Sequence, residues 1–107
     1  MNIKIGAFDF STTSKTFIIA ELSANHNQKF ELALQTVKAA RECGADAIKL
    51  QTYTADTLTI DSQQPYFQIK QGTLWDGKTL HQLYREAFTP WEWQPELKKT
   101  ANQLCLS

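Results

Sequence analysis

The sequence is poor in glycine, proline, cysteine and methionine, and it carries no net charge. Its 107 residues include four glycines, three prolines, two cysteines and one methionine. This composition excludes collagen-like repeats, proline-rich linkers and disulfide-rich secreted scaffolds. Because Cys43 and Cys105 are far apart and lack the spacing of metal ligands, we interpret both as reduced thiols.

Charge and hydrophobicity exclude two further classes of partner. Eleven basic residues balance eleven acidic ones, so the chain has no excess charge for nucleic acid or anionic lipid. No apolar run approaches the roughly 20 residues that span a bilayer. The opening residues, MNIKI, lack the long apolar core of a signal peptide. We therefore expect a cytoplasmic protein that binds neither nucleic acid nor membrane.

Hydrophobic periodicity predicts a parallel strand pair after a short hairpin. Alternation over residues 3–10 favours a β-hairpin, and the polar residues 11–15 favour a loop. Residues 17–22 are apolar on both faces, which is typical of a strand covered on both sides. A second strand is predicted over residues 45–51. The helix between them carries its apolar residues at helical spacing: Phe30, Ala33, Leu34, Val37 and Ala40.

The ends of that first helix have recognisable capping residues. Asn27 can cap the start, and Gly44 is suited to the left-handed position after the last turn. Strand, helix and strand follow one another with short connections. This order predicts a right-handed βαβ unit with parallel strands.

The second half of the chain predicts a long irregular segment and two more helices. Residues 52–78 show no clear period but hold several aromatic residues, which favours a functional loop over a linker. Thr79 is expected to cap a helix that runs to about Ala87. Thr89 is expected to cap another, with Pro90 in its first turn and Glu92 completing a capping box. Trp91, Leu97 and Leu104 of that last helix should face the core.

The final residues, 104–107, resemble the approach to a third strand. A hairpin, two parallel strands and their helices would leave sheet edges open. The sequence therefore predicts the opening portion of a larger α/β protein.

Polar side chains gather where the two predicted strands end. The carboxyl end of the first strand carries Glu21, Asn25 and His26, and that of the second carries Lys49, Gln51 and Tyr53. In parallel α/β folds, binding sites lie beyond the carboxyl ends of the strands. If Glu21, Lys49 and Gln51 share one face, Glu21 and Lys49 can pair.

These residue types leave alternatives open. The Glu21–Lys49 pair could be a buried structural ion pair, or Lys49 could form a Schiff base as in aldolases. His26 suits a hydrogen-bonding role in its loop better than metal ligation, because its neighbours are amides. The tryptophans are most simply packing residues, although Trp75 could line a sugar pocket.

Three motifs in order resemble the sialic acid synthase family over nearly the whole chain. They are IIAELSANHNQ, then CGADAIKLQTY, then GTLWDGKTLHQLYREAFTPWEW. The third motif is similar to the pseudaminic acid branch of that family.

The resemblance implies a fold and a domain arrangement. Members of the family are dimeric (β/α)₈ TIM barrels with a small antifreeze-like domain at the carboxyl terminus. Residues 1–107 would then be the N-terminal part of the barrel. Residues 1–16 would form the hairpin and loop, and residues 17–107 the first two βα units. The remaining strands and the C-terminal domain would be absent.

The resemblance also implies a reaction. Phosphoenolpyruvate condenses with 2,4-diacetamido-2,4,6-trideoxy-altropyranose to give pseudaminic acid and phosphate. A divalent metal, Mn²⁺ or Mg²⁺, would polarise the sugar aldehyde, with ligands outside this chain. Synthases of N-acetylneuraminate or legionaminate, or an inactive truncated remnant that only associates, are the alternatives.

The resemblance also implies roles for the residues that match the family's motifs. Glu21 matches a catalytic residue that moves protons. Lys49 matches a lysine that binds phosphoenolpyruvate, which displaces the Schiff-base interpretation. The other substrate-binding positions are Gln51, Asn25, His26, Tyr53 and Thr73. One departure is Gln28, where the family usually has glycine, and it should change the start of the following helix. Without the later strands, the isolated chain is expected to be inactive.

Overall fold

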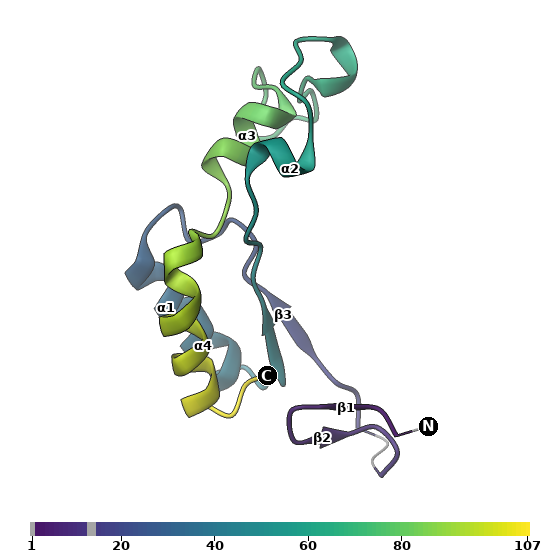
Figure 1. Ribbon diagram of the computed structural model, residues 1–107, viewed down its shortest axis with the longest axis vertical. Helices are drawn as coiled ribbons and strands as arrows, with labels where there is room; N and C mark the ends of the chain where they lie inside the picture. Colours follow the sequence, from purple (N-terminus) through teal and green to yellow (C-terminus); the bar gives the residue numbers. More distant parts are fainter. Residues whose placement is uncertain (1, 13–14) are drawn as a thin grey trace.

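The computed structural model describes residues 2–12 and 15–107, and these form an elongated molecule (Figure 1). Its principal extents are 50 × 33 × 25 Å and its radius of gyration is 16.7 Å. A compact domain of about 100 residues has a radius of gyration of about 13 Å. The described chain therefore spreads its elements more than a self-contained domain does.

The predicted N-terminal hairpin is confirmed. Strands β1 (Lys4–Ile5) and β2 (Phe8–Asp9) pair in antiparallel fashion, and Gly6 turns between them with φ of 57°. The left-handed conformation at this position favours glycine. Part of the predicted loop 11–15, at residues 13 and 14, lies outside the described residues.

The predicted parallel βαβ unit is confirmed. It comprises β3 (Ile19–Glu21), α1 (Phe30–Glu42) and β4 (Ala47–Lys49). The two strands are parallel and their register places Glu21 opposite Lys49. Both strands are shorter than the sequence indicated, with three residues each.

The sequence predicted the end of α1 correctly but not its start. The prediction that Asn27 caps the helix was wrong, since Lys29 occupies the N-cap position and no side chain caps the helix. Gly44 is confirmed in the left-handed conformation, with φ of 91°. The amides of Gly44 and Ala45 donate to the carbonyls of Arg41 and Ala40, at 3.0 Å in both cases. This arrangement is the Schellman ending of a helix.

The core lies between one face of the β3–β4 sheet and the helices α1 and α4 (Gln94–Gln103) (Figure 1). The expected coverage of both faces was wrong for the described residues, because Ile19 is 51% exposed and the Glu21 and Lys49 side chains on the same face are each 56% exposed. The described helices pack on one face alone. The buried core residues are Leu22, Ala33, Val37, Ala45, Leu97, Ala101 and Leu106.

The irregular segment contains short elements that the sequence did not predict. They are α2 (Ala55–Leu58) and the 3₁₀ turn η1 (Pro65–Phe67), and α3 (Leu80–Glu86) follows them. Thr79 is confirmed as the cap of α3, in a capping box with Gln82. Helices α2 and α3 and the segment between them project away from β3 and β4 (Figure 1).

The predicted start of the last helix was wrong. Pro90 precedes the 3₁₀ turn η2 (Trp91–Trp93), and α4 begins after it. Thr89 does not cap a helix because its side chain is fully buried against His26. Trp91 is 62% exposed, contrary to the expectation that it faces the core. Leu97 is buried and Leu104 packs against the core, as expected.

The predicted approach to a third strand is confirmed by backbone hydrogen bonds. The Ser107 amide donates to the Asp46 carbonyl, and the Ile48 amide donates to the Ser107 carbonyl, at 3.1 Å each. This pattern brackets Ala47 as in a parallel pair. Strand β4 therefore lies between β3 and Ser107, so neighbours in the sequence are neighbours in space.

Candidate functional site

Glu21 and Lys49 form the predicted pair at the carboxyl ends of β3 and β4. Their side chains are separated by 3.0 Å between Lys49 Nζ and Glu21 Oε1. Each side chain is 56% exposed, so the pair is not the buried ion pair that the sequence left open. An exposed pair of this kind contributes about 0–1 kcal/mol to stability. The Lys49 ammonium therefore remains accessible to an anion in solution.

Gln51 and Tyr53 lie in the segment that directly follows β4. The Gln51 carbonyl accepts a hydrogen bond from the Thr89 amide at 2.8 Å. The Tyr53 hydroxyl donates to the Ala87 carbonyl, and its ring meets Tyr84 edge to face. Burial raises the pKa of Tyr53. The Tyr53 hydroxyl is thus neutral, and its proton is used in the hydrogen bond to the backbone. Its oxygen can therefore only accept a hydrogen bond from a substrate.

Asn25 and His26 lie in the loop after β3, in different environments. Asn25 is exposed, whereas His26 is fully buried. The His26 Nδ1 atom accepts from the Gln28 amide at 3.1 Å, and Nε2 lies 3.3 Å from Thr89 Oγ1. Burial lowers the pKa of His26. Since Nδ1 is an acceptor, the ring is neutral and Nε2 carries the proton, so the predicted role as a hydrogen-bonding loop histidine is confirmed.

Thr73 lies in a tight turn organised by Asp76. The Asp76 carboxylate accepts hydrogen bonds from the amides of Gln71, Gly72 and Thr73 at 3.0–3.2 Å. These bonds, that from Thr73 first, lower the pKa of Asp76. The turn belongs to the segment that projects beyond α2 and α3 (Figure 1). The structure therefore does not bring Thr73 beside Glu21 and Lys49.

The sequence reasoning missed the role of Gln28. Its side-chain amide donates to the carbonyls of Glu86, at 2.8 Å, and Phe88, at 2.6 Å. The available indication was the departure from glycine at this position. That departure predicts only a change at the start of the helix, because the partners of Gln28 lie 58 and 60 residues away in sequence.

The tryptophans divide between packing and exposure. Trp93 meets His26 and Phe30 edge to face, with ring centroids 5.1 and 5.4 Å away, which confirms its packing role. Trp75 lies under the Lys78 ammonium, 5.3 Å from its ring centroid. It also lines a cavity of about 440 Å³ with Asn27 and Gln28. The sugar-pocket interpretation of Trp75 stays a prediction.

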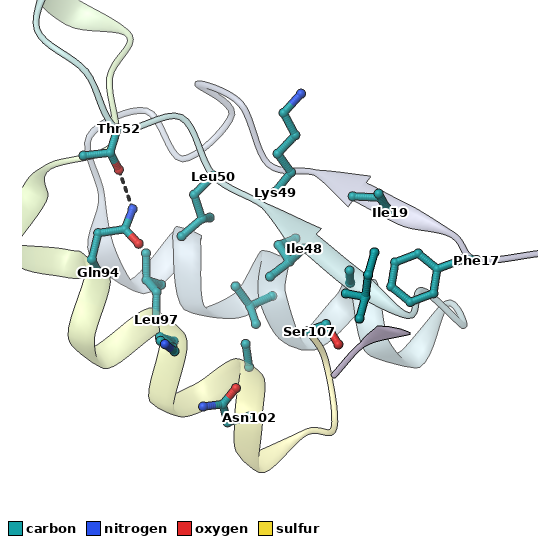
Figure 2. A pocket seen from close by; sticks show the side chains of 15 residues that line it. Phe17, Ile19, Ile48, Lys49, Leu50, Thr52, Gln94, Leu97, Asn102 and Ser107 are labelled. Atoms are coloured by element: carbon teal, nitrogen blue, oxygen red, sulfur yellow. Dashed lines mark hydrogen bonds between the residues drawn. The ribbon is translucent and has the colours of Figure 1, made fainter. Parts of the chain in front are cut away.

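A second cavity, of about 630 Å³, lies between β4 and α4 (Figure 2). Ile48, Leu50 and Leu97 supply apolar walls, and Thr52 and Gln94 hydrogen bond at one end. Lys49 points away from α4, and Glu21 does not line the cavity. The cavity is thus a largely apolar groove beside β4, and Lys49 of the Glu21–Lys49 pair contributes to its lining whereas Glu21 does not.

The described residues do not fit a metal site. In residues 2–12 and 15–107, no group of three or more His, Cys, Asp or Glu could hold a metal ion. Over the same residues, every helix is too short or too polar to cross a membrane.

Among known proteins, the chain is similar to several that are named as synthases of pseudaminic or legionaminic acid. It is 52% identical over 102 residues to the pseudaminic acid synthase of Campylobacter jejuni, covering 92% of this chain and 29% of that protein. It is 52% identical over 89 residues to the Helicobacter pylori enzyme of the same name, covering 83% and 26%. The N,N'-diacetyllegionaminic acid synthase of Legionella pneumophila is 52% identical over 58 residues, covering 53% and 16%.

A solved structure has a related fold. The crystal structure of the spore coat polysaccharide biosynthesis protein SpsE from Bacillus subtilis superposes with a TM-score of 0.66 at 25% sequence identity. The match covers 99% of this chain and 26% of SpsE. The chain therefore spans less than a third of the length of these relatives.

A family model gives the most direct assignment. It describes the NeuB family and matches residues 36–107, which is more than half of the chain. The motifs at both strand ends, the parallel unit that carries them and this match agree, and the chain belongs to the NeuB family.

Proposed function

We propose that this chain is the opening segment of a pseudaminic acid synthase. The complete enzyme would condense phosphoenolpyruvate with 2,4-diacetamido-2,4,6-trideoxy-altropyranose, releasing phosphate. Carbon 3 of phosphoenolpyruvate attacks the open-chain aldehyde, water adds at carbon 2, and phosphate leaves with its bridging oxygen. The observation that carries the proposal is the exposed Glu21–Lys49 pair at the ends of two parallel strands, in a chain 52% identical to named pseudaminic acid synthases.

The positions of the two side chains suit this chemistry. Both lie on the sheet face opposite the packed helices, which would be the interior if the sheet closed into a (β/α)₈ barrel. Lys49 can hold the phosphate or carboxylate of phosphoenolpyruvate as a fixed cation. Glu21, 3.0 Å from that cation, can take up or deliver a proton beside it.

The domain arrangement is part of the same proposal. Residues 1–16 would precede the barrel, and residues 17–107 would supply its first two βα units. The backbone bonds of Ser107 to β4 support continuation of the sheet by a parallel strand there. A divalent metal and a homodimer remain predictions for the complete enzyme. No step is assigned to the metal, since the described residues offer no ligand set.

A chimera tests the proposal. In it, this chain replaces the matching segment of the Campylobacter jejuni relative, which supplies the rest of the enzyme. We expect the chimera to release phosphate when given phosphoenolpyruvate and the altropyranose substrate. A folded chimera that binds neither substrate would overturn the proposal.

Legionaminic acid synthesis is the second candidate, because the Legionella relative is equally identical over its shorter match. The chimera should be compared with one built in the same way in the Legionella protein. If this chain belongs to the pseudaminic branch, it should retain more of the host's turnover in the Campylobacter host. The reverse order would favour the legionaminic assignment.

A further inference from the structure

We propose that Gln28 is a positioning residue, which fastens the loop after β3 to the residues that hold Gln51 and Tyr53. The inference rests on the proposed synthase function, in which we further take the substrate-binding positions Gln51 and Tyr53 to contact the amino sugar. Gln28 itself would touch neither substrate. It would act through residues 86–89, which we call the 86–89 linker and which run from the last residue of α3 toward η2.

The 86–89 linker receives hydrogen bonds from both strand ends. The Gln28 amide donates to the carbonyls of Glu86 and Phe88, and the Tyr53 hydroxyl donates to the carbonyl between them, that of Ala87. The Thr89 amide donates to the Gln51 carbonyl at 2.8 Å. Three consecutive carbonyls thus accept from side chains on two different loops.

His26 adds a second attachment from the side of β3. Its Nε2 atom lies 3.3 Å from Thr89 Oγ1, and both residues are fully buried. The loop after β3 therefore holds the linker at both of its ends, through Gln28 and His26. The stretch after β4 holds the same linker through Gln51 and Tyr53.

The chemistry of these contacts requires a side-chain amide. One amide nitrogen has two N–H donors, so Gln28 can satisfy two carbonyls at once. A carboxylate of the same shape has only acceptors and would repel both carbonyl oxygens. The carbonyls at the end of α3 have no partner within the helix, so they are available for this purpose.

The backbone around Gln28 is strained, which argues against an incidental contact. Asn27 and Gln28 adopt left-handed conformations, with φ of 47° and 55°. This region is unfavourable for most residues other than glycine and asparagine, so the strain lies mainly at Gln28. Replacing Gln28 by glycine would relieve the backbone strain and would also remove the side-chain contacts with the linker. In that variant the relieved strain offsets part of the lost stability, so an effect on substrate binding reports on the positioning of the linker.

The short strands explain why such a fastening matters. Strands β3 and β4 pair over three residues each, and a hydrogen bond from the Leu22 amide to the Lys49 carbonyl extends the pairing at 3.0 Å. Lys49 is thus held by the sheet itself. Gln51 and Tyr53 lie farther along and are held through the linker. Loss of Gln28 should therefore affect the sugar more than phosphoenolpyruvate.

The test compares Gln28→Glu and Gln28→Gly in the chimera, with Gln35→Glu on the exposed surface of α1 as the matched control. Both Gln28 variants should raise KM for the amino sugar about fivefold to tenfold, the range expected for lost hydrogen bonds. KM for phosphoenolpyruvate should change less than about twofold. Amide hydrogen exchange at Thr89 should accelerate in both variants and remain slow in the control.

The outcomes separate this inference from the proposed function. If the unsubstituted chimera folds but binds neither substrate, the proposed function fails, and exchange at Thr89 still decides whether Gln28 holds the linker. Unchanged exchange at Thr89 in both variants would overturn the inference. Equal rises in both KM values would also overturn it, since they would indicate a general structural role.

Discussion

At the scale of single residues, the accessible ammonium of Lys49 has the clearest chemical consequence. It lies opposite Glu21 across a parallel pair, and each side chain is more than half exposed. An exposed pair contributes little to folding. Substitutions here should therefore report on substrate chemistry rather than on stability.

Lys49→Ala in the chimera should weaken phosphoenolpyruvate binding by a factor of ten or more, since a charge-assisted contact is lost. The thermal midpoint should change little. Calorimetric titration with phosphoenolpyruvate measures the effect, and Lys38→Ala on the exposed face of α1 serves as the control. Binding that matches the control would remove Lys49 from the site.

Glu21→Gln keeps the shape of the side chain but removes its ability to exchange a proton. We expect kcat to fall about a hundredfold or more, as is typical when a general acid or base is lost. Binding of phosphoenolpyruvate should be retained. Wild-type turnover in steady-state assays of the variant would assign Glu21 a structural role.

The buried His26 should make stability depend on pH. Its folded pKa lies below the ordinary value, so the unfolded chain binds the proton more readily. The contribution is fully present above a pH of about 6.5 and declines as the pH falls toward the folded pKa. Thermal midpoints of the chimera and its His26→Gln variant, measured across that window, should converge in acid. Parallel curves would contradict this origin.

At the scale of elements, the packing of α4 against α1 carries much of the core. Leu97 is 1% exposed and belongs to the same buried cluster as Val37 on α1. The two helices are held together by this apolar contact. Residues on the exposed side of α4 do not take part.

Leu97→Ala should destabilise the protein by about 2–5 kcal/mol, because it removes a buried side chain and leaves a cavity. The thermal midpoint of the chimera should fall clearly. Lys99→Ala, two residues later and exposed, should leave it nearly unchanged. Equal midpoints for the two variants would show that α4 does not pack as described.

At the scale of the whole molecule, one sheet face and one sheet edge are left open among the described residues. Ile19 on that face is 51% exposed, and an apolar groove runs beside β4. Exposed apolar strand surface promotes association. The molecule is elongated because α2 and α3 pack on each other beyond the ends of the strands (Figure 1).

The isolated 107-residue chain should therefore associate in solution and release no phosphate from the two substrates. Sedimentation velocity at several concentrations measures the first property, and a phosphate assay measures the second. Phosphate release by the isolated chain would contradict the expected inactivity. A stable monomer at high concentration would contradict the expected association.

Local features of the chain were predictable from the sequence because they depend on neighbouring residues. The cap at Thr79, the helix end at Gly44 and the alternation along the strands involve contacts within a few positions. The parallel arrangement, and with it the Glu21–Lys49 pairing, follows from the order of strand, helix and strand. For this reason the candidate pair could be proposed before the structure.

Tertiary structure alone decided how polar side chains near the strand ends are used. Thr89 was expected to cap a helix, but it lies against His26, 63 positions away in sequence. Gln28 reaches carbonyls 58 and 60 positions away, which no local pattern reveals. The sequence likewise did not determine which strand residues are exposed, because the burial of a strand depends on which elements pack against it. The sequence determined which groups are available, and the packing of distant segments decided which of them meet.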